Sequence, residues 1–284
     1  MEQPACASAD SDNKPTGMTR LPSTPIINQD LRRRIVDLVT HGKGGHIPSA
    51  FSIVDIIATL YGQVLRFNPE RPRDENRDYF ILSKGHGCAA LYAVLHRHGF
   101  LSGAQMENYL GFDGILGGHP DRTKVPGAEA STGSLGHGLP FSLGIALGLK
   151  VRKRCNKVVT LVGDGECHEG TVWESALVAQ NLGLGNLCCI VDYNGSAAQI
   201  LPHPDIAAQW RAFGWQVREV DGHDPAAIAD AVKPFMAAGN DGAPTAIVAH
   251  TVKGRGVSFM ESHGPWHHRI PNLEEYAAIM KELE

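Results

Sequence analysis

The sequence predicts an α/β fold, a parallel sheet with helices on both faces, and three observations support this class. From residue 158 onward, short apolar runs such as VVTLV and LCCIVDY alternate with segments of helical spacing. Such nearly continuous apolar runs are typical of strands buried on both faces, and their alternation with helices is typical of parallel sheets. A chain of 284 residues, 43% of them hydrophobic, can also build the large core that this architecture needs.

The first half of the chain is expected to hold four helices and one strand. Apolar residues recur there at helical spacing, and the first segment, NQDLRRRIVDLVTHG, ends at a glycine. The short apolar run DYFILS is typical of a strand, and it stops at KGHG. The expected elements are helices at 28–42 and 50–65, a strand at 78–83, and helices at 88–99 and 139–154.

The second half is expected to alternate strand and helix without interruption. Each apolar run there is followed by a segment whose apolar residues recur with the helical period. The expected strands are 158–162, 187–193, 215–220 and 245–249, and the expected helices are 171–182, 206–213 and 225–238.

Residues 1–25 are expected to form a disordered tail, and residues 26–284 a single domain. The opening residues lack a basic region followed by an apolar block, so no secretory signal is expected. Within the domain, segment 114–138 is rich in glycine and polar residues and is longer than an ordinary connection. These properties favour a functional loop.

Composition argues against several classes of partner. A net charge of −4 and a pI near 6.4 give no electrostatic reason to expect a nucleic acid or an anionic membrane. The basic run KVRKR is expected to end a helix. The longest uncharged stretches are interrupted by glycine, proline or histidine well before the about 18 residues of a membrane helix, so no such helix is expected. The six cysteines include no CxxC pair, which favours a cytoplasmic location.

Polar residues follow several expected strands at the point where each strand ends. Asp164 comes after strand 158–162, and Asn194 comes directly after strand 187–193. His86 and the run TVKGRG follow two other strands. Because ligands bind beyond the carboxyl ends of parallel strands, we expect these groups to share one site.

Familiar phosphate and metal motifs do not fit this chain. Lys43 and Lys253 are each followed by glycine, whereas a Walker loop needs serine or threonine there. His168 stands where a dinucleotide fingerprint starting at Gly163 needs its third glycine. Val172 stands where a zinc protease helix needs its second histidine.

The remaining pattern predicts a metal-bridged diphosphate. Asp164 and Asn194 offer oxygen ligands, which suit a hard cation that also touches a phosphate. Gly163 and Gly165 would let backbone amides approach the anion. Two structural alternatives stay open, since Asp164 could cap the following helix and Asn194 could support a turn.

The run GDGECHEGTVWESALVAQNLGLGNLCCIVDYNG resembles the thiamine diphosphate motif in the form that transketolases use. The resemblance continues in order through GGHIPSAFSIVDI, FILSKGHG, GGHPDRTKVPGAEASTGSLGHG, VKGRG and WHHRIPN, and covers the chain from about residue 28 to its end. It implies the diphosphate-binding domain fold of this family. It also implies thiamine diphosphate and Mg²⁺, or Ca²⁺, as cofactors.

The resemblance assigns ligands residue by residue. The metal would be held by Asp164, Asn194 and the backbone carbonyl of Ser196. The expected contacts of the cofactor are His86, Gly133, Leu135, Gly163, Asp164, Gly165, Glu166, Asn194 and His267. One departure follows Asn194: many relatives read GLQID or GISID there, whereas this chain has the smaller residues of GSAAQ.

Three histidines are the implied contacts of the donor sugar. His46 and His119 match family histidines that contact sugar hydroxyls, and imidazole can donate and accept protons near neutral pH. His267 would be the third, because Arg269 and its neighbours also fit the family pattern. His263 is the alternative for that role.

Glu169 and Glu174 match acidic residues that lie between the two cofactors at the family's dimer interface, where they are expected to relay protons as a coupled network. Their position near the start of a helix also suits ordinary solvated charges, which the helix dipole favours.

The resemblance implies a transketolase subunit that moves a two-carbon ketol unit from a ketose to an aldose, both as sugar phosphates. Full transketolases continue into a pyrimidine domain whose glutamate activates the cofactor. We therefore expect this chain to be the amino-terminal subunit of a split transketolase, with two copies of it and two of a pyrimidine-domain partner. Two alternatives stay open: another two-chain thiamine enzyme, acting on a 2-oxo acid or an unusual sugar of specialised metabolism, and a non-catalytic scaffold.

Overall fold

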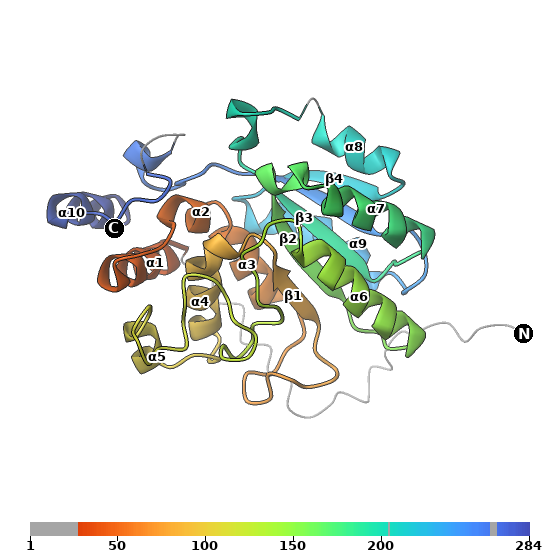
Figure 1. The fold of residues 1–284 in the computed structure, drawn as a ribbon, viewed down its shortest axis with the longest axis horizontal. Coiled ribbons are helices and arrows are strands. Elements are labelled where there is room, and N and C mark those ends of the chain that lie inside the picture. The colour runs from red at the N-terminus through yellow and green to blue at the C-terminus, as the bar shows by residue number, and fades with distance from the viewer. Residues whose placement is uncertain (1–27, 204, 262–265) are drawn as a thin grey trace, which may run out of the picture.

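Five parallel strands form one sheet in the order β1-β2-β3-β5-β4 (Figure 1). The computed structural model describes residues 28–203, 205–261 and 266–284, so the expected tail at 1–25 and His263 lie outside the described residues. The strands are β1 (Tyr79–Leu82), β2 (Val158–Gly163), β3 (Leu187–Tyr193), β4 (Gln216–Asp221) and β5 (Thr245–His250). The predicted α/β class with a parallel sheet is confirmed.

Helices flank the sheet and extend beyond the β1 edge. They are α1 (Asn28–Gly42), α2 (Ile47–Phe51), α3 (Val54–Thr59), α4 (Cys88–Arg97), α5 (Gly103–Glu107), α6 (Gly138–Val151), α7 (Gly170–Asn181), α8 (Ile206–Ala212), α9 (Pro225–Ala237) and α10 (Leu273–Glu282). Helices α5 and α10 were not among the expected elements. Both begin with a capping box, at Ser102 with Gln105 and at Asn272 with Glu275, which is a signal the sequence does contain.

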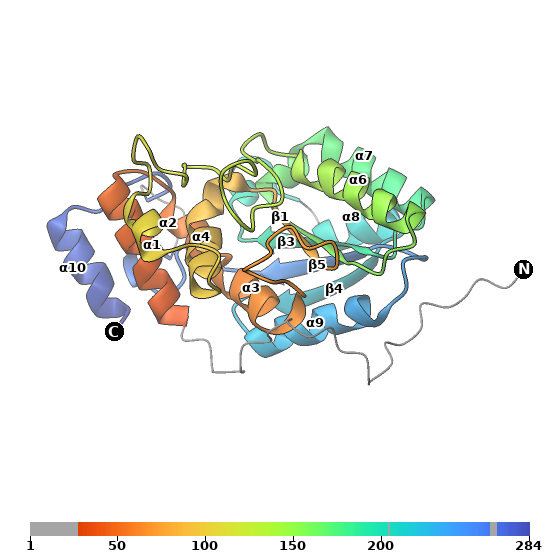
Figure 2. The same cartoon turned by 90° about the horizontal axis from the view of Figure 1, so that it is seen from below.

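The strands separate two apolar layers. In β2, Val159 and Leu161 pack in the layer of α3, α4 and α9, whereas Val158 and Val162 pack in the layer of α6, α7 and α8. Figure 2 shows α6, α7 and α8 on one side of the sheet and α3 and α9 on the other. Every residue of β2 is buried, which explains its uninterrupted apolar sequence.

The helix predicted at 50–65 differs from what the structure shows. It begins earlier, at Ile47, and divides into α2, α3 and a π-helical turn at Leu60–Val64. Ser52 lies at the break between α2 and α3, where its hydroxyl donates to the Asp192 carboxylate at 2.8 Å. Buried apolar residues continue through the break, so their periodicity carries no sign of it.

None of the helices in the described part of the chain combines the length and apolar character that a bilayer span requires.

Alanine substitutions at two glycines of α6 should have opposite effects on the stability of the chain. A Cβ added at Gly138 would lie 2.7 Å from the Ser83 Cα, which is backbone and cannot move aside, so Gly138→Ala should lower the melting temperature. A Cβ at Gly144 meets nothing within 4 Å. Gly144→Ala should therefore stabilise the chain by up to about 1 kcal/mol through helix propensity. Thermal unfolding of both variants checks this, and a Gly138→Ala variant as stable as the parent would contradict the packing.

Candidate active site

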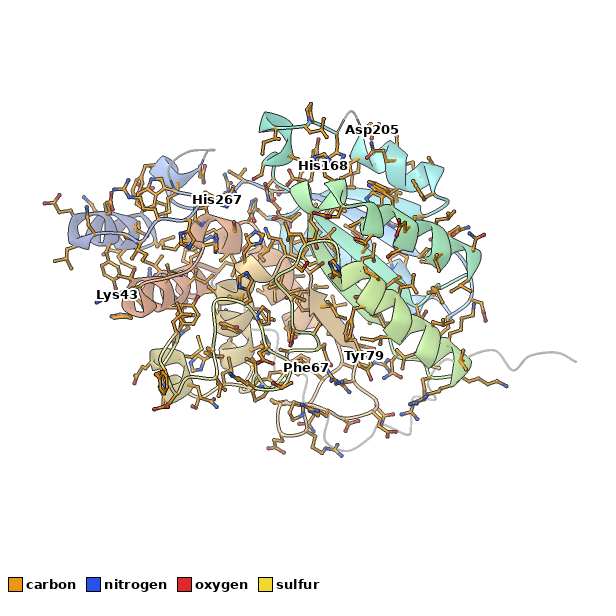
Figure 3. The ribbon with its side chains drawn as sticks, in the orientation of Figure 1. Lys43, Phe67, Tyr79, His168, Asp205 and His267 are labelled. Carbon is orange, nitrogen blue, oxygen red and sulfur yellow. The ribbon has the colours of Figure 1, made fainter. Side chains whose placement is uncertain are left out.

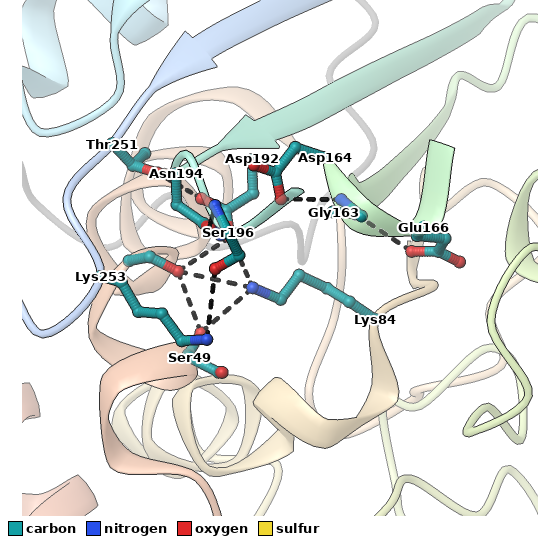
Figure 4. A network of polar contacts seen from close by, with 12 residues as sticks. Ser49, Lys84, Gly163, Asp164, Glu166, Asp192, Asn194, Ser196, Thr251 and Lys253 are labelled. Carbon is teal, nitrogen blue, oxygen red and sulfur yellow. Dashed lines mark hydrogen bonds and ion pairs between the residues drawn. The ribbon is translucent and has the colours of Figure 1, made fainter. Parts of the chain in front are cut away.

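The predicted polar groups meet at the carboxyl edge of the sheet. Asp164 follows β2, Asn194 follows β3, and the turn carrying Lys253 follows β5. Figure 4 shows Lys84, Asn194, Ser196 and Lys253 gathered around the ends of these strands. This arrangement agrees with the expectation that these segments share one site.

Asp164 is almost fully buried, with 2% of its surface exposed. One of its carboxylate oxygens accepts from the Gly165 backbone N–H at 2.7 Å, so the side chain caps the 3₁₀ turn Gly165–His168. The other accepts from the Ala197 N–H at 3.3 Å. This second contact brings the segment after Asn194 over the end of β2 and places Ser196 close to Asp164.

Asn194 is held at both ends of its amide. Its Oδ1 accepts from the Ser196 N–H at 3.0 Å, which forms a turn, and its Nδ2 donates to Asp192 at 2.8 Å. The contact with Asp192 fixes which end of the amide is oxygen. That oxygen lies on the same side as the Ser196 backbone, where the expected metal would be held.

The donor set suits a hard cation that brings further ligands with it. Asp164, Asn194 and the Ser196 carbonyl would supply oxygen atoms of the kind that Mg²⁺ and Ca²⁺ prefer. Across the described residues, no three side chains of His, Cys, Asp or Glu gather as metal ligands. A cation held at this edge would take further oxygen ligands from water or a bound ligand, and the oxygens of a diphosphate would be suitable.

Asp192, which the sequence patterns did not single out, is the fully buried anion beneath this site. It pairs with the Nζ of Lys84, which is itself only 2% exposed. It also accepts from Ser52, Asn194 and Thr251. Burial alone would raise the pKa of Asp192, but the Lys84 charge and these hydrogen bonds outweigh it and hold that pKa below its usual value.

Lys253 brings a second cation to the site. Its Nζ donates to the Ser196 hydroxyl at 3.2 Å and to the His267 Nδ1 at 2.8 Å, and both of these partners are uncharged. Burial, together with repulsion from Lys84, lowers the pKa of Lys253 despite the carboxylates of Asp192 and Asp164. A lysine at each strand end, in SKGHG and in VKGRG, was the sequence signal for these cations.

The buried Glu166 carboxylate forms hydrogen bonds with three segments of the chain. Its carboxylate accepts from the Ser83 hydroxyl, from the Gly136 N–H at 2.8 Å and from the Gly163 N–H at 3.1 Å. Burial raises the pKa of Glu166 although these donors act to lower it. The side chain therefore holds the loops that carry the predicted cofactor contacts, and direct contact of Glu166 with a cofactor remains a prediction.

The loop 133–137 lies against the start of α7. The Thr171 hydroxyl donates to the Gly136 carbonyl at 2.9 Å, and a Cβ at Gly136 would lie 2.9 Å from the Glu169 Cγ. Gly136 has a φ of +81°, so both its backbone conformation and its packing require glycine. Leu135 is half-buried beside it.

Four histidines cluster on the other side of the site. The His46 ring lies 5.4 Å from His86, 5.6 Å from His267 and 4.7 Å from His268, measured between ring centroids. His268 was not predicted, because no strand end or glycine loop marks it. In Figure 3, His267 lies near α1 and α2, whereas His168 lies near the start of α7.

His119 completes the predicted set. Its ring packs against Gly133, because a Cβ there would meet the His119 Cδ2 at 3.2 Å. Electrostatic repulsion between the two rings also contributes to the lowered pKa of His46. The structure thus brings His46, His86, His119 and His267 to one region beside the cation site.

Burial and mutual repulsion keep two of these rings neutral. Burial, and then the neighbouring histidines, lowers the pKa of His46 to about 4. Burial, and then the Lys84 charge, lowers the pKa of His86 to about 2. At pH 7 both rings are therefore hydrogen-bonding groups without charge.

Glu169 and Glu174 face solvent in this chain. Glu169 packs beside Gly136 at the start of α7, and Glu174 lies one turn further along that helix. Their expected place at a subunit interface stays a prediction.

Sequence comparison places this site in a known family. A family profile described as "Transketolase, thiamine diphosphate binding domain" matches residues 24–281. A subunit of an apulose-4-phosphate transketolase from Phocaeicola vulgatus is 36% identical over 258 residues, covering 89% of this chain and 90% of the relative. A 6-deoxy-6-sulfo-D-fructose transketolase subunit of Clostridium sp. is 35% identical over 84% of this chain and 88% of its own length.

Full-length transketolases match over part of their length. The transketolase of Homo sapiens is 37% identical over 84% of this chain, which spans 38% of the human protein. The transketolase structure from Leishmania mexicana superposes with a TM-score of 0.83 at 28% identity, covering 90% of this chain and 40% of that chain. With sequence and structure in agreement, the chain belongs to the transketolase family and carries its thiamine diphosphate-binding domain.

Proposed function

We propose that this chain is the diphosphate-binding subunit of a two-chain transketolase, which transfers a two-carbon ketol unit from a ketose phosphate to an aldose phosphate. The observation that carries the proposal is the meeting of Asp164, Asn194 and Ser196 with two lysines at the strand ends, beside a histidine cluster. The relatives named as subunits of apulose-4-phosphate transketolases support the two-chain assembly.

Residues of the cation site would hold the cofactor. Asp164, Asn194 and the Ser196 carbonyl would bind Mg²⁺, and Lys253 would offset the diphosphate charge. When bound, thiamine diphosphate supplies the nucleophilic carbon that carries the two-carbon unit. Gly133 and Leu135 would border its rings, since their loop is fixed next to α7.

The histidines would handle the sugar. His46, His119 and His267 would contact its hydroxyl groups, and a neutral ring such as His46 can donate to one hydroxyl and accept from another. This arrangement would orient the donor ketose and move protons at its hydroxyl oxygens during cleavage of the carbon–carbon bond.

A partner subunit with a pyrimidine domain would cover the remaining side of the cofactor. Glu169 and Glu174 would face that assembly, in which we propose two copies of each chain. We also propose a cytoplasmic location. The buried cysteines Cys88, Cys167, Cys188 and Cys189 form no disulfide, which agrees with a reducing compartment.

One observation favours a second candidate. Ser196, from the altered GSAAQ run, stands where many relatives have leucine or isoleucine, and its hydroxyl accepts from Lys253 at 3.2 Å. The smaller residues of this run would change the space beside the cation site, which would suit a two-chain thiamine enzyme that acts on a 2-oxo acid or an unusual sugar. Comparing sugar phosphates with 2-oxo acids as donors distinguishes the two, and a preference for a 2-oxo acid would overturn the substrate proposed here.

Removing the proposed metal ligand should weaken cofactor binding. Asp164→Ala should weaken Mg²⁺-dependent binding of thiamine diphosphate by at least about tenfold in calorimetry, because a charged ligand is lost. Asp205→Ala is the matched control, since Asp205 caps α8 (Figure 3) and its loss should cost about 1 kcal/mol of stability without changing binding. Unchanged binding and activity in Asp164→Ala would rule out metal ligation at this position.

Ketol transfer should require the partner chain. The purified chain should show no transfer between a ketose phosphate and an aldose phosphate, and adding a pyrimidine-domain subunit should restore it, because this chain offers one side of the site. Coupled assays of each chain alone and of the mixture test this. Transfer by the chain on its own would refute the two-chain assignment.

Stability should fall as the pH is lowered from about 7 to 4.5. The folded state holds His46 with a pKa of about 4 and His86 with a pKa of about 2, whereas both titrate near 6.5 when unfolded. The unfolded chain binds more protons in this window, so the free energy of unfolding rises with pH there. Denaturant titrations at several pH values measure the slope. It should be shallower in His86→Asn and unchanged in His41→Asn, and an equal slope in all three proteins would contradict the assignment.

A further inference from the structure

A second buried ion pair lies behind the site, between α1 and α3. Asp55 is 2% exposed and Arg32 is 6% exposed. The guanidinium binds both carboxylate oxygens, through Nη1 at 3.1 Å and Nη2 at 2.7 Å. Burial alone would raise the pKa of Asp55, but hydrogen bonds from His223 and Arg32 outweigh it and lower that pKa. Asp55 is therefore a fixed anion at neutral pH.

His223 connects this anion to the turn after β5. Its Nδ1 lies 2.7 Å from the Asp55 Oδ2, and its Nε2 lies 2.8 Å from the backbone nitrogen of Val252. A backbone N–H can only donate, so Nε2 is the acceptor and Nδ1 carries the proton that is donated to Asp55. The carboxylate thus selects the tautomer of His223 and aims its lone pair at Val252.

The turn is held from several directions. The Arg32 Nε donates to the Arg255 carbonyl at 2.8 Å, and the Gly254 N–H donates to the Pro48 carbonyl at 3.2 Å. A Cβ at Gly222 would lie 3.2 Å from the His250 carbonyl oxygen, so glycine allows the loops after β4 and β5 to approach closely. Between these anchors, Lys253 projects to Ser196.

We propose that His223, held by Asp55 and Arg32, is a positioning residue that fixes the turn after β5 and so holds the Lys253 amino group at the diphosphate. This inference rests on the proposed function, because it takes a diphosphate as the ligand of Lys253. None of Arg32, Asp55 and His223 needs to touch the cofactor, and the three come from segments that are far apart in the sequence.

The side-chain geometry provides a matched set of variants. The amide nitrogen of asparagine can occupy the place of the imidazole Nδ1, so His223→Asn keeps the contact with Asp55 and loses the acceptor for Val252. Glutamine reaches the place of Nε2, so His223→Gln keeps an acceptor for the Val252 N–H. Glutamine is also closer to histidine in volume than asparagine is, so the coupling with Lys253, rather than the order of these two variants, separates positioning from packing.

A double-mutant cycle with Lys253 tests the proposal in the full chain. The probe is inorganic pyrophosphate with Mg²⁺, measured by calorimetry on the parent, His223→Asn, His223→Gln, Lys253→Ala and the double variant His223→Asn/Lys253→Ala. His223→Asn should weaken binding about tenfold, and His223→Gln should restore most of the loss. The double variant should bind no more weakly than Lys253→Ala alone, because His223 acts through that lysine.

Each other outcome of the cycle has a distinct meaning. Independent effects that multiply in the double variant would overturn the proposal, since His223 would then act by another route. Two results would instead overturn the proposed function. One is that the parent chain fails to bind pyrophosphate, and the other is that binding survives Asp164→Ala.

Hydrogen exchange supplies a readout that needs no ligand. The Val252 amide should exchange faster in His223→Asn than in the parent, and near the parent rate in His223→Gln. His98→Asn is the control, because His98 is another buried histidine and lies at the end of α4, away from this turn. It should lower stability without changing the Val252 exchange rate relative to global unfolding. An unchanged Val252 rate in a folded His223→Asn variant would sink the idea.

Discussion

The ion pair between Lys84 and Asp192 is the contact on which the carboxyl edge of the sheet depends. Both side chains are buried, so neither charge is solvated, and the removal of one partner from such a pair typically costs about 3–5 kcal/mol. Asp192 also accepts from Ser52, Asn194 and Thr251. One carboxylate therefore joins the end of β1, the break between α2 and α3, and the ends of β3 and β5. The orientation of the Asn194 amide follows from this contact.

The same pair sets the charge of the site. Asp192 neutralises Lys84 below the surface, whereas the hydrogen-bonding partners of Lys253 are the uncharged Ser196 and His267. The region around Asp164 thus keeps a cation and a set of oxygen donors suited to a metal-bound diphosphate. The histidines beside it are different in character, because burial keeps His46 uncharged at neutral pH. Under the proposed function, the charged end would hold the diphosphate and the neutral end would contact sugar hydroxyl groups.

Under the proposed function, the chain would offer one wall of the active site. The loop 133–137 and the start of α7 are fixed to each other through Gly136 and Thr171, while Glu169 and Glu174 face outward next to that loop. Relatives named as transketolase subunits have nearly the length of this chain, and the human transketolase is far longer than the part that matches it. Geometry and comparison both favour a site completed by a second polypeptide.

The amino-acid sequence was enough to predict the fold class, the positions of the strands, and the placement of Asp164 and Asn194 at two strand ends. It could do so because strands buried on both faces must be apolar throughout, as β2 is, and because a residue after a parallel strand lies at the ligand edge. The position of β5 between β3 and β4 is seen only in the folded chain. The position of β5 brings Thr251 and Lys253 to Asp192 and Ser196. No local sequence pattern predicts this position. Buried charges such as Asp55 find partners such as His223 that lie more than a hundred residues away in the sequence. Periodicity cannot predict such pairs, because it indicates only which face of an element is buried.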